Sequence, residues 1–199
     1  VVYLGKAVGT INPASGSVGI SQLSATGTKD ATTFLRGDNS FAVPTDNGKI
    51  LQIVTVTKTD TFSSTSTSHV DITDLSLSIT PSSTSSKIQI IAMLSCGATN
   101  TASCHFLIDR GGSPIIRGDA ASNRPRSTTS VQSNASGQPM SATINTIDSP
   151  ATTSSTTYKI QMRNSGGGTS FLNRCATDAD GATQAGRHAS TFTLMEIGA

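Results

Sequence analysis

The chain has 199 residues and a formal net charge of +2, with 13% charged residues, 4% aromatic residues and no Trp. This length suffices for one domain with an appendage, or for two small domains. So weak a charge, with Lys and Arg scattered along the chain, argues against nucleic acid and against an anionic membrane as partner. No run approaches 18 apolar residues, so we expect no membrane insertion.

The composition predicts an all-β protein. Ser, Thr, Val and Ile are abundant and Gly punctuates them, whereas the Ala-Glu-Lys-Leu periodicity of helices is absent. A disordered chain would carry more charge and fewer β-branched residues. We therefore expect strands throughout and no helix.

Residues 1–48 carry short apolar pieces separated by Gly, Ser, Thr, Asn and Pro. None is long enough to build a layer of core strands, so the segment needs neighbours from the next domain or from other copies of the chain. A loosely ordered linker is the alternative. The chain begins with Val1 rather than Met, so we expect a processed chain or one that lacks earlier residues.

The pattern changes at Lys49, where a domain over 49–199 is predicted. The run "KILQIVTVTK" is apolar on both faces and predicts a strand buried on both sides, whereas "VDITDLSLSITP" alternates and predicts a half-buried strand. The runs "KIQIIAMLSCG" and "CHFLIDR" predict two more strands. Gly111-Gly112 then predict a tight turn into "SPIIRG".

A long polar stretch, 119–139, has no apolar periodicity and is interpreted as a functional loop. Strands are predicted again at "MSATINTID", "TTYKIQMRN", "SFLNRC" and the closing "TFTLMEIGA", with a second long loop at "ATDADGATQAGRHAS". Eight or so strands at roughly ten-residue spacing are typical of a sandwich or jelly roll.

The residues that most often bind metals do not cluster in the sequence. His69, His105 and His188 lie far apart, and Cys96, Cys104 and Cys175 have no metal-ligand spacing. Free buried thiols are favoured over a disulfide between the first two cysteines. The run "DADG" lacks the later Glu of a calcium loop and is interpreted as a solvated loop. We expect no metal and no cofactor.

No catalytic pattern stands out either. No Ser occupies a G-x-S-x-G elbow with a credible base. Carboxylates are spread through predicted strands and turns, at Asp71, Asp74, Asp109, Asp119, Asp148 and Glu196. A glycosidase needs two carboxylates facing each other in a groove, and the chain has a single Glu and no Trp. We expect no enzymatic activity.

The tripeptide Arg-Gly-Asp, which animal integrins bind, occurs at 36–38 and at 117–119. Both copies follow apolar residues, as where a strand runs out into a turn. Gly tolerates positive φ and Asp bonds its own backbone, so Gly-Asp is an ordinary turn sequence. A turn is favoured over an integrin ligand in both places.

The segment "TGTKDATTFLRGDNSFAVP" resembles one that is common in phage tail-fibre and virion-fibre proteins, where "TFLRGD" closes one module before the distal domain. The preceding "SVGISQL" is similar to the repeat units of such fibres. The runs "FLIDRGGSPIIRGD", "DSPATTSSTTYKIQMRN" and "STFTLMEIGA" resemble a C-terminal head module of marine phages. The family often has Trp where this chain has Phe41.

The resemblance implies a homotrimeric virion fibre, with an extended trimeric segment over 1–48 and a jelly-roll-like antiparallel β-sandwich head over 49–199. Its partners would be other copies of itself, other virion proteins of the tail or capsid, and a host surface glycan or lipopolysaccharide. Three copies wound together would bury apolar side chains of the first segment, namely Ile11, Val18, Ile20, Leu23, Phe34 and Leu35.

Receptor contacts are predicted in the two long polar loops, because several weak identical sites gain strength through multivalency. The candidates are Asn123, Arg124, Arg126, Asn134 and Gln138 in one loop, and Asp178, Asp180 and Arg187 in the other. Two alternatives stay open. One is a structural tail or capsid appendage that binds no receptor, and the other is a depolymerase, which would need a long repetitive β-helix.

Overall fold

The computed structural model describes residues 15, 24–44, 48–99, 102–181 and 185–198. The chain divides into two compact units, Val1–Thr45 and Asp46–Ala199. Within the described residues every regular element is a strand, as the composition predicted.

The first unit contains a small hairpin. Strands β1 (Phe34–Leu35) and β2 (Phe41–Ala42) pair antiparallel. The amide of Asn39, whose φ is 61°, donates to the Arg36 carbonyl at 3.0 Å. The Asp38 carboxylate accepts from the Ser40 amide at 3.1 Å. The first Arg-Gly-Asp is therefore the turn of a hairpin, which confirms the prediction.

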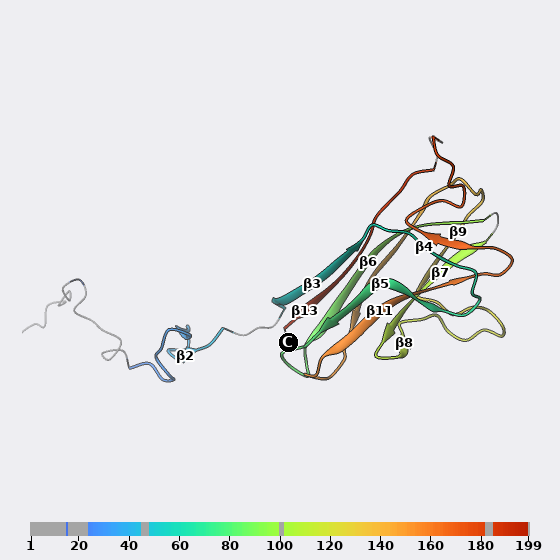
Figure 1. Ribbon diagram of the computed structural model, residues 1–199. Coiled ribbons are helices and arrows are strands. Elements are labelled where there is room, and N and C mark those ends of the chain that lie inside the picture. Colours follow the sequence, from blue (N-terminus) through green and yellow to red (C-terminus); the bar gives the residue numbers. More distant parts are fainter. Residues whose placement is uncertain (1–14, 16–23, 45–47, 100–101, 182–184, 199) are drawn as a thin grey trace, which may run out of the picture. The chain divides into compact units, whose positions relative to one another are not determined.

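The second unit is a sandwich of two antiparallel sheets (Figure 1). Its strands are β3 (Ile50–Lys58), β4 (Phe62–Ser64), β5 (Val70–Ile79), β6 (Lys87–Ala98), β7 (Ser103–Arg110), β8 (Ser113–Ile115), β9 (Thr129–Gln132), β10 (Met140–Asp148), β11 (Thr156–Asn164), β12 (Ser170–Leu172) and β13 (Ser190–Ile197).

The strand order is that of a jelly roll. The first sheet runs β3–β13–β6–β10. Beyond the end of β13, the short strand β12 pairs with the same edge of β6, and β4 pairs with β12. The second sheet runs β5–β11–β7, with β8 and β9 both on the far edge of β7. When β8 and β9 are counted as halves of one strand, the long strands follow the orders 1-8-3-6 and 2-7-4-5. This double Greek key confirms the predicted fold class; the predicted fibre segment lies mostly outside the described residues.

The core lies between the two sheets, where alternate residues of each strand face inward. Ile90 and Leu94 of β6 and Phe192 of β13 are fully buried on one side, and Phe106 and Ile160 on the other. Strand β5 buries Ile72, Leu75 and Ile79, packs Leu77 against the core and exposes the polar residues between them, so the half-buried prediction is confirmed.

Strand β3 differs from its prediction. Val54 and Val56 pack against the core, but Ile53 is 58% exposed and Ile50 is 57% exposed. Only one sheet covers this strand, so its second face points away from the sandwich. The prediction of a strand buried on both sides is wrong for the single chain.

The polar stretch 119–139 is also not one loop. Strand β9 lies within it and pairs with β7. Ile108 of β7 pairs with Ile115 of β8, and Phe106 of β7 pairs with Thr129 of β9. Only one β7 residue lies between these two pairs, so residues 116–128 leave the sheet edge there and return to it. We call residues 116–128 the edge excursion.

The second Arg-Gly-Asp lies in this edge excursion. The chain leaves β8 at Ile116, whose φ is 50°, and the Gly118 amide donates to the Ser127 carbonyl at 3.2 Å. The tripeptide itself forms no turn, so the turn prediction is wrong for this copy. The reversal occurs further on, where the Arg124 amide donates to the Ala121 carbonyl.

The three cysteines are free and buried, as predicted. The Cys104 thiol donates to the Gly97 carbonyl at 3.3 Å. The Cα of Cys175 lies 2.8 Å from the place that a Cβ on Gly97 would occupy, so two of the thiol residues pack around one glycine. The pKa of Cys96 is raised by its hydrogen bond with the Cys104 thiol and by burial, which makes it an unreactive core thiol.

Candidate binding surfaces

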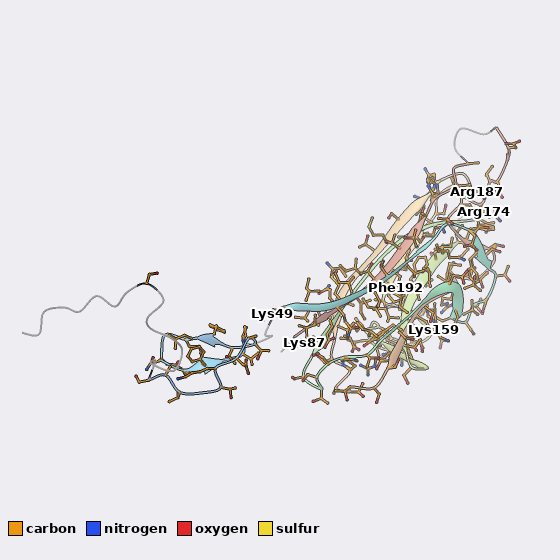
Figure 2. The ribbon with its side chains drawn as sticks, turned by 60° about the vertical axis from the view of Figure 1, so that its left-hand side comes forward. Lys49, Lys87, Lys159, Arg174, Arg187 and Phe192 are labelled. Carbon is orange, nitrogen blue, oxygen red and sulfur yellow. The ribbon has the colours of Figure 1, made fainter. Side chains whose placement is uncertain are left out.

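The structure separates the predicted receptor residues into two groups. Asn123, Arg124 and Arg126 lie in the edge excursion, whereas the other five lie in the β9–β10 and β12–β13 loops. A hydrogen bond of 2.9 Å from the Thr177 amide to the Ser136 carbonyl joins these two loops. Figure 2 shows Arg174 and Arg187 at this end of the sandwich and Lys49 and Lys87 at the other end.

The β12–β13 loop uses its charges internally. Asp178 forms ion pairs with Arg187 at 2.6 Å and with Arg174 at 3.4 Å. Arg174 also stacks on the Phe171 ring, 3.9 Å from its centroid. A hollow of about 360 Å³ is lined by Asp178, Ala179, Asp180, Gly181, Ala185 and Arg187. Because Asp178 and Arg187 neutralise each other, this loop offers a ligand mainly polar and backbone groups.

A buried polar network supports these loops from below. Asn173 donates to the carbonyls of Lys58 and Asp60, both at 2.8 Å, and accepts from the Ser190 hydroxyl at 2.6 Å. The Lys58 ammonium, fully buried, pairs with Asp60 at 2.7 Å and with Asp74 at 3.5 Å. Every one of these groups has a partner, so the network orders the loop bases.

The opposite end has a polar clasp between the sheets. Asp148, which ends β10, accepts from Arg110 of β7 and from Tyr158 of β11. Nearby, a hollow of about 370 Å³ is lined by Arg110, Gly111, Pro150, Thr152, Ser155, Thr156 and Thr157. The carboxylate of Asp148 is already occupied by the donors of Arg110 and Tyr158.

Glu196 is a second structural carboxylate. It is 1% exposed and accepts from Gln52 at 2.5 Å and from the amide and hydroxyl of Ser82 at 2.7 and 2.6 Å. Burial alone would raise the pKa of Glu196, but these hydrogen bonds outweigh burial and lower the pKa to about 2. It therefore stays ionised and ties β13 to the turn after β5.

The centre of the outer face of the first sheet carries no charge, and Lys87, paired with Ile197, lies at its border. Cross-strand partners share a face, so the registers of β3, β13, β6 and β10 place three rows of four side chains on it. The rows are Ile53, Met195, Gln89 and Ile147; Thr55, Thr193, Ile91 and Asn145; and Thr57, Thr191, Met93 and Thr143. We call these twelve residues the neutral face.

The neutral face exposes large apolar side chains. Ile53, Met93 and Ile147 are 58%, 57% and 50% exposed. Its polar members bond to one another, as Thr55 does to Thr193 at 2.8 Å and Gln89 does to Asn145. Sequence analysis missed the face because the outer residues are spread over four strands that are far apart in the chain. The available signal was "KILQIVTVTK", whose outward residues are Ile and Thr rather than charged.

The outer face of the second sheet has a different character. His69 and His105, which the sequence places far apart, both lie beside Arg163 on it. No group of three or more His, Cys, Asp or Glu suited to a metal ion occurs among the residues that the structure describes.

The described residues include only two of the predicted trimer-interface residues. Phe34 and Leu35 lie in β1 and are 48% and 44% exposed. Ile11, Val18, Ile20 and Leu23 lie outside the described residues.

Comparison with known proteins gives weak likenesses. No protein-family model matches the chain, and no curated protein matches it. Among solved structures, the chain is similar to one of infectious bursal disease virus, Gx strain, with 17% identity and a TM-score of 0.40 over 80% of this chain and 40% of that one. It is also similar to the VP2 subviral particle of infectious bursal disease virus, with 14% identity and a TM-score of 0.34 over 79% of this chain and 40% of that one. The chain thus spans about 40% of the length of the structures it matches.

In the described part of the chain, no helix has the length and apolarity to cross a membrane.

Proposed function

We propose that this chain is a structural protein of a virus particle, that it assembles as a homotrimer, and that its β-sandwich attaches the particle to the host surface. The neutral face is the observation that carries the proposal. The jelly-roll order, which is widespread in viral capsid and lectin domains, and the resemblance of "TTFLRGDNSF" to fibre proteins support it.

The neutral face has the size and chemistry of an interface centre. Four strands about 4.8 Å apart and three rows of alternate residues cover roughly 400 Å². Five of its twelve side chains are apolar, and the largest apolar patch on a protein surface is often functional. A standard interface takes about 800 Å² from each partner and excludes charge from its centre. The neutral face therefore supplies about half of one such contact.

Its occupant is a second copy of the same chain. A charge-free face can be covered by another copy without burying an unpaired charge, whereas a charged partner would lose solvation and gain no ion pair. Ile53, at the β3 edge, and Ile147, at the β10 edge, place apolar side chains on both borders. Such borders suit a closed ring, in which each subunit contacts two neighbours.

Attachment falls to the sandwich surfaces that assembly leaves open. Three identical weak sites on one trimer, repeated on one particle, bind a polysaccharide through effective concentration. The proposed role is binding without catalysis, and the carboxylates of Asp109, Asp148 and Glu196 are all held by structural donors. A capsid or tail appendage that binds no receptor is the second candidate, favoured by the same neutral face.

Binding of the purified full-length chain to host cells tests the proposal. We expect saturable binding, inhibition of particle adsorption by excess protein, and no shortening of host polysaccharide during incubation. Assembly into particles without any cell binding would favour the appendage. Shortened polysaccharide would contradict the non-catalytic role.

A further inference from the structure

A row of basic side chains crosses the outer face of the second sheet. Arg163 of β11 pairs directly with His105 of β7. On the other side of β11, Met162 pairs with Val70 of β5. His69 directly precedes Val70 in the chain, so it lies beside Arg163. Side chains directly opposite each other on one face have Cβ atoms about 5 Å apart. His69, Arg163 and His105 are therefore neighbours.

The edge excursion adds a second arginine to this row. The Gly118 amide donates to the Ser127 carbonyl at 3.2 Å, and the Arg126 Nε donates to the Gly118 carbonyl at 2.7 Å. The Ser127 hydroxyl lies 3.4 Å from Nδ1 of His105. These contacts hold the chain at Arg117 against the row. We call Arg117, Arg163, His69 and His105 the basic cluster.

The basic cluster has no counter-charge among the residues that the structure describes. No described carboxylate forms an ion pair with Arg117 or Arg163. The Arg163 guanidinium donates from its Nε to the carbonyl of Asn164 at 3.3 Å. The closest acid along β5, Asp71, is bound by Lys159 at 2.7 Å and by Gln161 at 2.8 Å.

The electrostatics agree with this geometry. Burial lowers the pKa of His69 to about 4, and the positive charges of Arg163, His105 and Arg117 add to the effect. Burial and Arg163 also lower the pKa of His105. Nε2 of His69 is buried and has no hydrogen-bond partner. A buried polar atom without a partner is rare in folded proteins, and here it lies beside two unpaired arginines.

We propose that the basic cluster binds an oxyanion group, a carboxylate or a phosphate, carried by a host surface glycan. This inference rests on the attachment role proposed above and names the receptor chemistry for it. The two guanidinium groups supply charge-assisted donors in a planar fork that matches both oxyanions. The imidazole of His69 supplies the unused Nε2 position, and the anion neutralises charges that otherwise repel one another.

The inference moves the receptor site away from the predicted loops. Of the eight loop residues, only Arg126 contributes, and it does so by fixing the Gly118 carbonyl rather than by touching the ligand. Arg117, the first residue of the second Arg-Gly-Asp, takes the central role. The tripeptide then matters for its arginine and for the Gly118 backbone, which is bonded to Ser127 and holds this side chain in place.

The first test uses the full-length chain with three probes: inorganic phosphate, glucuronate, and glucose as the neutral control. We expect phosphate or glucuronate to shift the ring resonances of His69 and His105 in NMR spectra, and glucose to leave them unchanged. Arg117→Gln and Arg163→Gln should each weaken binding about tenfold or more. Arg124→Gln, an exposed arginine of the same edge excursion, should leave binding unchanged.

The probes separate the two sources of the oxyanion. Stronger binding of glucuronate identifies an acidic sugar, and stronger binding of phosphate identifies a phosphorylated glycan. If neither probe shifts the histidine resonances, or if Arg124→Gln weakens binding as much as Arg163→Gln does, the inference is overturned.

Cell binding distinguishes this inference from the proposed function. If the wild-type chain binds host cells and the double variant Arg117→Gln, Arg163→Gln binds equally well, the basic cluster is not the receptor site and the attachment role stands. If the wild-type chain binds the probes but not the cells, the oxyanion site stands and the attachment role fails.

Discussion

The Tyr158 hydroxyl donates a 2.7 Å hydrogen bond to the Asp148 carboxylate, and this bond joins the two sheets of the sandwich. Tyr158 belongs to β11 of the second sheet, whereas Asp148 ends β10 of the first. Arg110 completes the clasp at 2.8 Å from both carboxylate oxygens. Burial raises the pKa of Tyr158, and its bond to Asp148 acts in the same direction, so the hydroxyl remains a donor.

Removing this hydroxyl should destabilise the fold. Tyr158→Phe keeps the fully buried ring but leaves the side chain of Asp148, which is 10% exposed, with one donor fewer. We expect the free energy of unfolding to fall by about 1–3 kcal/mol in denaturant titrations, the range for hydrogen bonds to charged groups. Ser78→Ala, which removes an exposed cross-strand bond to Thr157, should cost under about 0.5 kcal/mol. Equal losses in the two variants would refute the clasp.

Gly97 is predicted to be intolerant of any side chain. A Cβ there would lie 2.7 Å from the Arg174 carbonyl oxygen and 2.8 Å from the Cys175 Cα, and both atoms are backbone. Gly97→Ala should therefore cost about 2 kcal/mol or more, measured by thermal unfolding. A Cβ on Gly118 would lie 4.0 Å from its nearest neighbour, the Ser127 carbonyl oxygen, so Gly118→Ala is the matched control and should be nearly neutral. A stable Gly97→Ala protein would show that the β12–β13 loop does not pack as described.

Glu196 should make stability fall in strong acid. The folded-state pKa of Glu196, about 2, lies below the ordinary value of 4.5 for a Glu side chain, so the folded state binds fewer protons between these values. The stabilisation is present above pH 4.5 and is lost as pH falls toward 2, amounting to about 3 kcal/mol. Glu196→Gln should flatten the stability curve in this window. An unchanged slope between pH 4.5 and 2 in the variant would contradict the assignment.

His69 should make the stability depend on pH in a separate, higher pH range. The folded-state pKa of His69, about 4, lies below the ordinary value of 6.5 for a His side chain, because His69 is partly buried and faces Arg163, His105 and Arg117. The unfolded state binds more protons between pH 4 and 6.5, so stability should fall as pH drops through this range. His69→Gln should remove part of that slope and leave the Glu196 window intact. Saturating phosphate should also reduce the slope, because an anion favours the charged imidazole.

Several strands of the sandwich were predictable from the sequence because they carry a period-2 signal of their own. "VDITDLSLSITP" alternates along its length, and the Gly111-Gly112 turn has the positive φ values, 58° and 89°, that two glycines allow. Local chemistry sufficed in these cases. The fold class followed from the number and spacing of such segments.

The surfaces were not predictable in the same way, since they depend on which strands become neighbours. Nothing in the sequence places His69 beside His105; the pairings of β11 with both β5 and β7 do so. Strand β9 was missed for a related reason. Its run "TSVQ" is polar and short, and only its pairing with β7 makes it a strand. The same pairing splits the supposed single loop and carries Arg117 away from Asn134.

The neutral face is the centre of the account, and the mass of the full-length chain in solution tests it most directly. Light scattering should give three times the chain mass of 20.3 kDa for the wild type and for Ser76→Lys, an exposed position on β5 of the other sheet. The double variant Ile53→Lys, Ile147→Lys, which places charge on both borders of the neutral face, should be a folded monomer. A monomeric wild type, or a double variant that remains a trimer, would contradict the account.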